Sequence, residues 1–207
     1  QRKWTSFSRL GAKAFAVNAS DIIAMGGVPN FVLLSVSIPP EDRVEDLESF
    51  FDGFLAATAE RNVALIGGNM SAAACLMLSV TLLGHAPHGL VTRSGAQPGD
   101  DLYVTGTLGD AALGLRLFQT GQSDTLADTL AQQVQARFLC PTVRYEVSHT
   151  LASKNVPTAM LDVSDGLLQD LGHMCEESQT GAVVEAARLP LSAGYAAILG
   201  PDAWDLA

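Results

Sequence analysis

The chain has 207 residues, of which 48% are hydrophobic and 16% charged. This composition excludes a disordered protein and supplies enough apolar side chains for one large core or two small ones. Twelve Lys and Arg residues against 22 Asp and Glu give a formal net charge of −10. Such an acidic surface repels nucleic acid, so a bound phosphate group would need local compensation from backbone N–H groups, an arginine or a divalent metal.

The cysteines and the two ends of the chain favour a cytoplasmic protein that is given only in part. Cys75, Cys140 and Cys175 are far apart and form no CxxC pair, so we expect them to be reduced and buried. Neither a signal peptide nor an initiator Met opens the sequence, which predicts a cut N-terminus. Residues 62–92 carry no charged side chain, but Gly, His and Pro interrupt them, so we expect a buried segment and no membrane span.

The first ninety residues predict an α+β domain. One helix is expected over residues 9–25, with Ser8 as its cap, and a second over 44–58, where apolar residues recur with i, i+3, i+4 spacing. The apolar runs 31–38, 63–66 and 75–83 predict strands, the middle one ending in a tight turn at Gly67-Gly68.

The second half predicts an α/β domain. Residues 89–99 are rich in turn formers, which indicates a boundary between a first domain, 1–90, and a second domain, 91–207. Beyond the boundary, residue patterns typical of strands alternate with patterns typical of helices. Strands are expected at 101–105, 157–163 and 182–185, and helices at 110–118, 123–138, 143–152 and 165–177.

The strongest local signal is Asp162-Val163-Ser164-Asp165-Gly166, where a predicted strand ends and a helix begins. Free N–H groups and the helix dipole favour anions at such a place. Asp162 and Asp165 can also hold a hard cation such as Mg²⁺ through their oxygens. The simpler alternative is that Ser164 only caps the helix and that Asp165 lies favourably in its first turn.

Three further segments are candidates. Asn18 and Asp21 lie on one face of the first helix in an apolar stretch, so a buried Asp21 would need a partner or a metal, unless that face is exposed. The Gly67-Gly68-Asn69 segment would let backbone approach a ligand closely, or is simply a tight connection. Arg93 interrupts an uncharged stretch and predicts either a phosphate clamp or a surface salt bridge.

Several other site classes lose support. His85 and His88 lie three residues apart with no third ligand nearby, so no zinc site is expected there. The chain contains no GxSxG, HExxH, GxxxxGK[ST] or GxGxxG motif. Serine hydrolases, zincins, Walker-type nucleotidases and Rossmann proteins are therefore disfavoured.

Taken in order, these segments resemble the thiamine-monophosphate kinase family of the aminoimidazole ribonucleotide (AIR) synthetase superfamily. Residues 16–29, AVNASDIIAMGGVP, resemble the family segment VNxSDxAAMGxxP, and residues 65–68, 93–100 and 161–172 resemble its later blocks. The resemblance extends over residues 4–191. It implies a two-domain α+β fold, with an N-terminal α+β dimerisation domain and a C-terminal α/β domain, incomplete at both ends.

The resemblance also implies an activity and a set of site residues. The family phosphorylates thiamine phosphate to thiamine diphosphate by direct in-line transfer from ATP with Mg²⁺, as a homodimer, without a dedicated catalytic base. By correspondence, the metal ligands are Asp21, Asp162, Asp165 and Asn69, and the nucleotide contacts are Gly68, Asn69, Arg93 and Ser164. Asn69 stands where the family usually has Asp, and it keeps a carbonyl oxygen but lacks the charge.

Two alternatives to this kinase remain open. One is another ATP-dependent enzyme of the superfamily, of the hydrogenase-maturation or selenophosphate type. Such an enzyme would need a reactive cysteine or a special tail, and none of the three cysteines is placed to serve. The other is a nucleotide-binding paralogue without catalysis, which Asn69 alone supports.

Overall fold

The computed structural model describes residues 2–121 and 128–200. The chain forms two compact units. Unit 1 comprises Gln1–Leu90 and Thr142–Val156, and unit 2 comprises Val91–Pro141 and Pro157–Ala207. The chain therefore passes between the units at residues 90/91, 141/142 and 156/157. A segment from the second half of the sequence thus completes the N-terminal unit.

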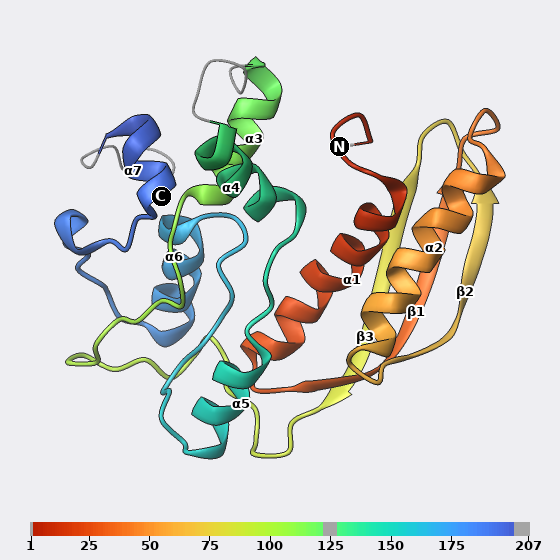
Figure 1. Cartoon of the computed structure of the whole chain (residues 1–207). Coiled ribbons are helices and arrows are strands. Elements are labelled where there is room, and N and C mark those ends of the chain that lie inside the picture. The colour runs from red at the N-terminus through yellow and green to blue at the C-terminus, as the bar shows by residue number, and fades with distance from the viewer. Residues whose placement is uncertain (1, 122–127, 201–207) are drawn as a thin grey trace. The chain divides into compact units, whose positions relative to one another are not determined.

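Unit 1 is built on a three-stranded sheet with the order β2-β1-β3. The central strand β1 (Val28–Ile38) runs parallel to β2 (Ala64–Ala72) and antiparallel to β3 (Met77–His85). Helices α1 (Phe7–Ala24) and α2 (Val44–Ala59) lie against one face of the sheet (Figure 1). Because side chains alternate along a strand, every second residue of β1 faces these helices. The buried core contains Ala14, Phe15, Ala19, Val32, Leu34, Val36, Phe50, Phe54 and Val63.

The two helices pack closely because each has a glycine at the crossing. A Cβ atom on Gly11 would lie 2.0 Å from the carbonyl oxygen of Phe50, and one on Gly53 would lie 1.9 Å from that of Ser8. Neither position has room for a side chain. The cap of α1 is Ser6, whose hydroxyl accepts the N–H of Arg9 at 3.3 Å. The predicted cap, Ser8, is wrong because it already lies inside the helix.

Strand β2 differs from its prediction. The chain does not turn at Gly67-Gly68 but continues extended to Ala72, paired with β1, after a register shift opposite Val32 and Leu33. A Cβ atom on Gly68 would lie 1.8 Å from the Leu34 carbonyl oxygen. Glycine therefore serves close strand pairing and not a tight turn. The strand is also largely exposed, where a buried one was expected.

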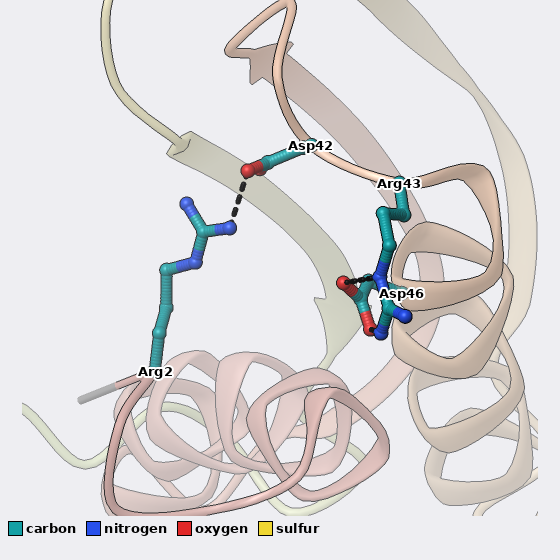
Figure 2. Close-up of polar contacts among 4 residues, drawn as sticks. All are labelled: Arg2, Asp42, Arg43 and Asp46. Carbon is teal, nitrogen blue, oxygen red and sulfur yellow. Dashed lines mark hydrogen bonds and ion pairs between the residues drawn. The ribbon is translucent and has the colours of Figure 1, made fainter.

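Ion pairs surround the start of α2 (Figure 2). Arg2 pairs with Asp42, and Arg43 donates to both carboxylate oxygens of Asp46 at 3.0 and 2.9 Å. The hydrogen bond from Arg43 lowers the pKa of Asp46, and the same contact raises the pKa of Arg43. Asp46 also lies in the first turn of α2, where the helix dipole favours a negative charge.

Helix α5 (Tyr145–Ser153) belongs to unit 1. The Ser148 hydroxyl donates to the carbonyl oxygen of Ile23 at the end of α1. The guanidinium carbon of Arg61 lies 4.0 Å from the centre of the Tyr145 ring. These contacts explain why α5, which was predicted as part of the second domain, packs in unit 1.

Unit 2 contains α3 (Asp110–Thr120), α4 (Asp128–Leu139), α6 (Leu167–Ser178), the 3₁₀ helix η2 (Ala186–Arg188) and α7 (Ala193–Leu199). Its core gathers Leu113, Leu117, Ala131, Val134 and Tyr195. The predicted helices are present, although residues 123–127 of one prediction fall outside the described part of the chain.

The strands predicted in unit 2 are not formed. Residues 101–105, 157–163 and 182–185 form no ladder, and the described part of this unit shows only an isolated bridge between Leu108 and Leu191. An apolar run indicates an extended segment but does not supply the partner that a ladder requires.

Two other expectations concern the surface. All three cysteines are free, but Cys75 and Cys140 are exposed and Cys175 is half-buried, so the prediction that they are buried is wrong. Among the described residues, no helix has the length and apolar character needed to cross a membrane.

Candidate functional site

The loop 162–166 in front of α6 is organised by a residue that the motif analysis did not single out. Asp170 is only 5% exposed. One of its carboxylate oxygens accepts the backbone N–H groups of Ser164, Asp165 and Gly166, at 2.9, 3.1 and 3.2 Å. Three converging donors hold the loop in a single conformation around this carboxylate.

This arrangement changes what the start of α6 can bind. The N–H groups of Ser164, Asp165 and Gly166 already donate to Asp170, so these three donors are not available to an anion. Gly166, with φ of 119°, takes the capping position, and Ser164 does not cap the helix. Asp162 is half-buried and Asp165 is exposed. The loop therefore presents carboxylate oxygens, which suit a hard cation.

The segment around Arg93 is held by the other end of α6. The Ser178 hydroxyl accepts the N–H groups of Gly95 and Ala96, each at 3.1 Å, and lies 3.1 Å from the Arg93 carbonyl oxygen, to which it donates. The Arg93 side chain is exposed. Asp170 and Ser178 thus anchor two candidate loops to one helix.

The same segment is tied to residues 158–160. The N–H of Met160 donates to the Thr92 carbonyl oxygen at 3.0 Å. Asp100 accepts the Thr158 hydroxyl at 2.7 Å and the Gln97 N–H at 2.8 Å. These hydrogen bonds favour the ionised carboxylate, and they lower the pKa of Asp100.

A cavity of about 590 Å³ lies within unit 2, a volume in the range of small-molecule sites. The segment 96–104, helix α6 and the segment 180–190 line it. Its walls include apolar side chains from all three, and Asp170 is one of the lining residues. An organic group of modest size fits this space, next to the loop that carries Asp162 and Asp165.

The candidates of unit 1 lie on α1 and β2. Asp21 is exposed on α1, which agrees with the second of the two alternatives for this face, and the Asn18 amide donates to the Ala14 carbonyl oxygen at 2.8 Å. Asn69 is exposed on β2 and pairs with Ser35 of β1, whose neighbours Leu34 and Val36 are buried under the helices. Asn69 therefore lies on the sheet face away from α1 and α2.

The predicted site residues divide between the units. Unit 1 contains Asp21, Gly68 and Asn69, and unit 2 contains Arg93 and the 162–166 loop. Across the residues that the structure describes, no three His, Cys, Asp or Glu side chains are grouped as a metal site would require. Sequence reasoning missed Asp170 and Ser178. The signal that could have pointed to Asp170 is its place within the block 161–172, which resembles a block of the family.

Comparisons with known proteins agree over nearly the whole chain. The family described as "AIR synthase related protein, N-terminal domain" matches residues 3–86, and its C-terminal counterpart matches residues 97–203. A thiamine-monophosphate kinase of Salmonella typhimurium is 39% identical over 184 residues, which are 88% of this chain and 55% of that protein. The chain therefore spans about half the length of such curated relatives.

The chain also matches solved structures of thiamine-monophosphate kinases. The crystal structure of thiamine monophosphate kinase from Aquifex aeolicus matches with a TM-score of 0.88 and 31% identity, covering 98% of this chain and 68% of that one. A second Aquifex structure, described as complexed with AMPPCP and TMP, matches with a TM-score of 0.86 and 32% identity, covering 95% and 63%. The predicted two-domain α+β fold is confirmed.

Proposed function

This chain belongs to the thiamine-monophosphate kinase family of AIR synthase-related proteins, and from that premise we propose that it catalyses the ATP-dependent phosphorylation of thiamine phosphate to thiamine diphosphate. The observation that carries the proposal is the loop 162–166, which bears two carboxylates. Its backbone is held by Asp170, and it lies beside a cavity of suitable size. The Aquifex relative described as complexed with AMPPCP and TMP supports both substrates.

The residues of this loop fit Mg²⁺. Their donors are hard oxygens, and the backbone N–H groups of Ser164, Asp165 and Gly166 are engaged by Asp170. Mg²⁺ commonly uses one or two protein carboxylates and fills its remaining positions with water and phosphate oxygens. A cluster of three protein ligands is therefore not required. We propose Asp162 and Asp165 as ligands in unit 2, and Asp21 and Asn69 as oxygen donors in unit 1.

The remaining candidates are proposed as nucleotide contacts. Arg93 is exposed on a segment anchored by Ser178, so its guanidinium is positioned to bind a phosphate as a charged fork. Ser164 offers a hydroxyl from the fixed loop, and the backbone of Gly68 has no side chain in the way. Bound Mg²⁺ would offset phosphate charge, which resolves how an acidic chain accepts ATP.

The phosphoryl transfer does not require a strong base from the protein. A phosphate oxygen of thiamine phosphate would attack the terminal phosphorus of ATP in line, as the bond to the ADP oxygen breaks. The attacking phosphate is already ionised near neutral pH, so no proton has to be removed. The chain's residues would orient the two phosphates and hold them against their mutual repulsion.

One observation favours a second candidate function. Asn69 is exposed on β2 and carries no charge where the family usually has a carboxylate. The chain could then bind nucleotide without turning it over. In that case Asn69→Asp should raise the affinity for Mg²⁺ and leave turnover absent.

We also propose that unit 1 forms a homodimer through the sheet face away from α1 and α2. On this face Phe31 and Leu83 lie opposite each other and are 47% and 49% exposed. Paired exposed apolar side chains are costly to leave in water. Sedimentation at micromolar concentration should show a dimer, and Phe31→Glu should convert it to a monomer with the same helix content.

The decisive test uses the full-length protein that contains this chain. ATP and thiamine phosphate are supplied with and without Mg²⁺, and thiamine diphosphate is followed by chromatography. Product should form only with Mg²⁺ and be lost in Asp165→Asn and in Asp21→Asn, whereas Asp52→Asn, an exposed change on α2, should retain it. ATP binding without product would support the non-catalytic alternative, and absence of nucleotide binding would contradict both.

A further inference from the structure

We propose that His88 and His149 form a binding site for a divalent transition-metal ion, with Zn²⁺ as the best fit. His88 lies in the turn after β3, and His149 lies on α5. Their Nε2 atoms are 3.4 Å apart although the residues are 61 positions apart in sequence. Both side chains belong to unit 1 and are exposed, so an ion can reach them from solvent.

The distance between the two nitrogens suits a shared ion. Two Zn–N bonds of about 2.0–2.1 Å that meet at a tetrahedral angle place the nitrogens about 3.3–3.4 Å apart. The observed separation is 3.4 Å. For a direct N–H···N hydrogen bond the same distance is long, since the usual range ends near about 3.2 Å.

The orientation of the rings leads to the same conclusion. With both bonds along the ring axes, a tetrahedral Zn²⁺ site would set the ring centroids about 5.3 Å apart. A linear hydrogen bond of the observed length would set them about 5.7 Å apart. The observed centroids are 5.0 Å apart, and the ring planes meet at 75°. The observed separation is closer to the value for a shared ion, and the ring axes are inclined to the line between the nitrogens and do not lie end to end.

The two imidazole nitrogens determine which metal ions this site would bind. Neutral imidazole nitrogens bind Zn²⁺, Cu²⁺ and Ni²⁺ well, whereas Mg²⁺ prefers oxygen. Water would complete the coordination, because the described residues contain no group of three or more His, Cys, Asp or Glu that could hold a metal. The site should accordingly bind less tightly than a structural zinc site with four protein ligands.

An ion at this place would join two parts of unit 1 that are distant in sequence. Helix α5 is held on unit 1 by the hydrogen bond from Ser148 to Ile23 and by the contact between Arg61 and Tyr145. The bridge from His149 to His88 would add an attachment to the end of β3. Bound Zn²⁺ should therefore stabilise the docking of α5 and raise the melting temperature by a few degrees.

The test titrates Zn²⁺ into the whole chain while the imidazole nitrogens are followed by NMR. Excess Mg²⁺ keeps the carboxylate sites filled, and the imidazole signals separate histidine binding from binding by the three cysteines. The Nε2 resonances of His88 and His149 should shift together and saturate at one equivalent. His85, which lies in the same segment and contacts Asn30 at 2.7 Å, is the internal control and should not follow them.

Substitutions complete the test. His88→Gln and His149→Gln should each weaken Zn²⁺ binding by at least about tenfold, and His85→Gln should not. Melting in the presence of a chelator shows that the variants are folded. The proposal is overturned if one of the two resonances shifts without the other, or if Zn²⁺ affinity is unchanged in His88→Gln. The wild-type NMR titration decides the matter even if a variant fails to fold.

Discussion

The carboxylate of Asp170 lies 3.1 Å from the backbone nitrogen of Asp165 and accepts its N–H. Asp170 is buried and accepts three backbone N–H groups, while the Asp165 carboxylate is exposed and has only a long contact, 3.4 Å, from the Gln169 amide. The two residues are five positions apart and have different tasks, the first in holding the loop and the second in binding. Their substitutions should therefore have separable effects.

Replacing Asp170 should damage both stability and turnover. Asp170→Asn removes the charge that three N–H groups share, and hydrogen bonds to a charged group contribute about 1.5–3 kcal/mol. We expect the free energy of unfolding in urea to fall by about 2 kcal/mol, with a large loss of thiamine diphosphate formation. The matched variant Asp165→Asn should lose product while its unfolding curve stays close to wild type. Equal destabilisation by both changes would contradict this division of tasks.

Ser178 should affect nucleotide binding more than the chemical step. Ser178→Ala removes the acceptor of the Gly95 and Ala96 N–H groups and the donor to the Arg93 carbonyl. The segment that carries Arg93 then loses its anchor, so we expect KM for ATP to rise several-fold with kcat little changed. Ser153→Ala, which removes a hydroxyl bound only within α5, is the control. A fall in kcat at constant KM would count against a positioning role.

The close pairing of β1 and β2 predicts that alanine substitutions at the adjacent Gly67 and Gly68 will differ in their effect on stability. A Cβ atom on Gly68 would lie 1.8 Å from the Leu34 carbonyl oxygen, while one on Gly67 would meet only the Leu33 side chain, at 3.4 Å. Both have φ of 159°, so any backbone cost is common to the two. Gly68→Ala should reduce the free energy of unfolding by about 2–3 kcal/mol more than Gly67→Ala. Chemical denaturation measures the difference, and equal effects would show that the strands can separate without cost.

Asp100 predicts a pH dependence of stability. Its pKa is lowered, first by the Thr158 hydroxyl and then by the Gln97 N–H. The folded chain therefore holds the ionised form better than the unfolded chain does, and this stabilisation is complete above the ordinary carboxyl pKa of 3.8. As the pH falls through the lowered value, the stabilisation is lost. Urea unfolding of wild type and Asp100→Asn should differ at neutral pH and converge in acid, with Thr158→Val showing a smaller pH effect.

Sequence alone predicted the helices better than the strands, for physical reasons. The apolar residues of α2 recur with helical spacing, so the prediction of 44–58 nearly coincides with Val44–Ala59. The extension of β2 through Gly67 and Gly68 depends on the partner strand β1, which is distant in sequence. Helix signals are local, whereas strand pairing is decided by contacts that the pattern does not contain.

Only some residues of the proposed site could be singled out from the sequence. The motif residues Asp162, Asp165 and Arg93 were visible because their residue types suit metal and phosphate chemistry. Asp170 and Ser178 were not, because an aspartate within a helix and a serine at its end suit many roles. Their importance comes from the backbone groups that they contact, and these contacts exist only in the folded chain. The placement of His149 beside His88 was invisible for the same reason.

The return of residues Thr142–Val156 to unit 1 has a consequence for biosynthesis. Ser148 and Ile23 are separated by 125 positions, so the contact between them must wait until the ribosome has released the segment containing α5. By then the whole first stretch of unit 2, Val91–Pro141, has already emerged. The N-terminal unit cannot be completed before the first stretch of the next unit has been synthesised, and we expect the two to mature in an interleaved order during translation and not one after the other.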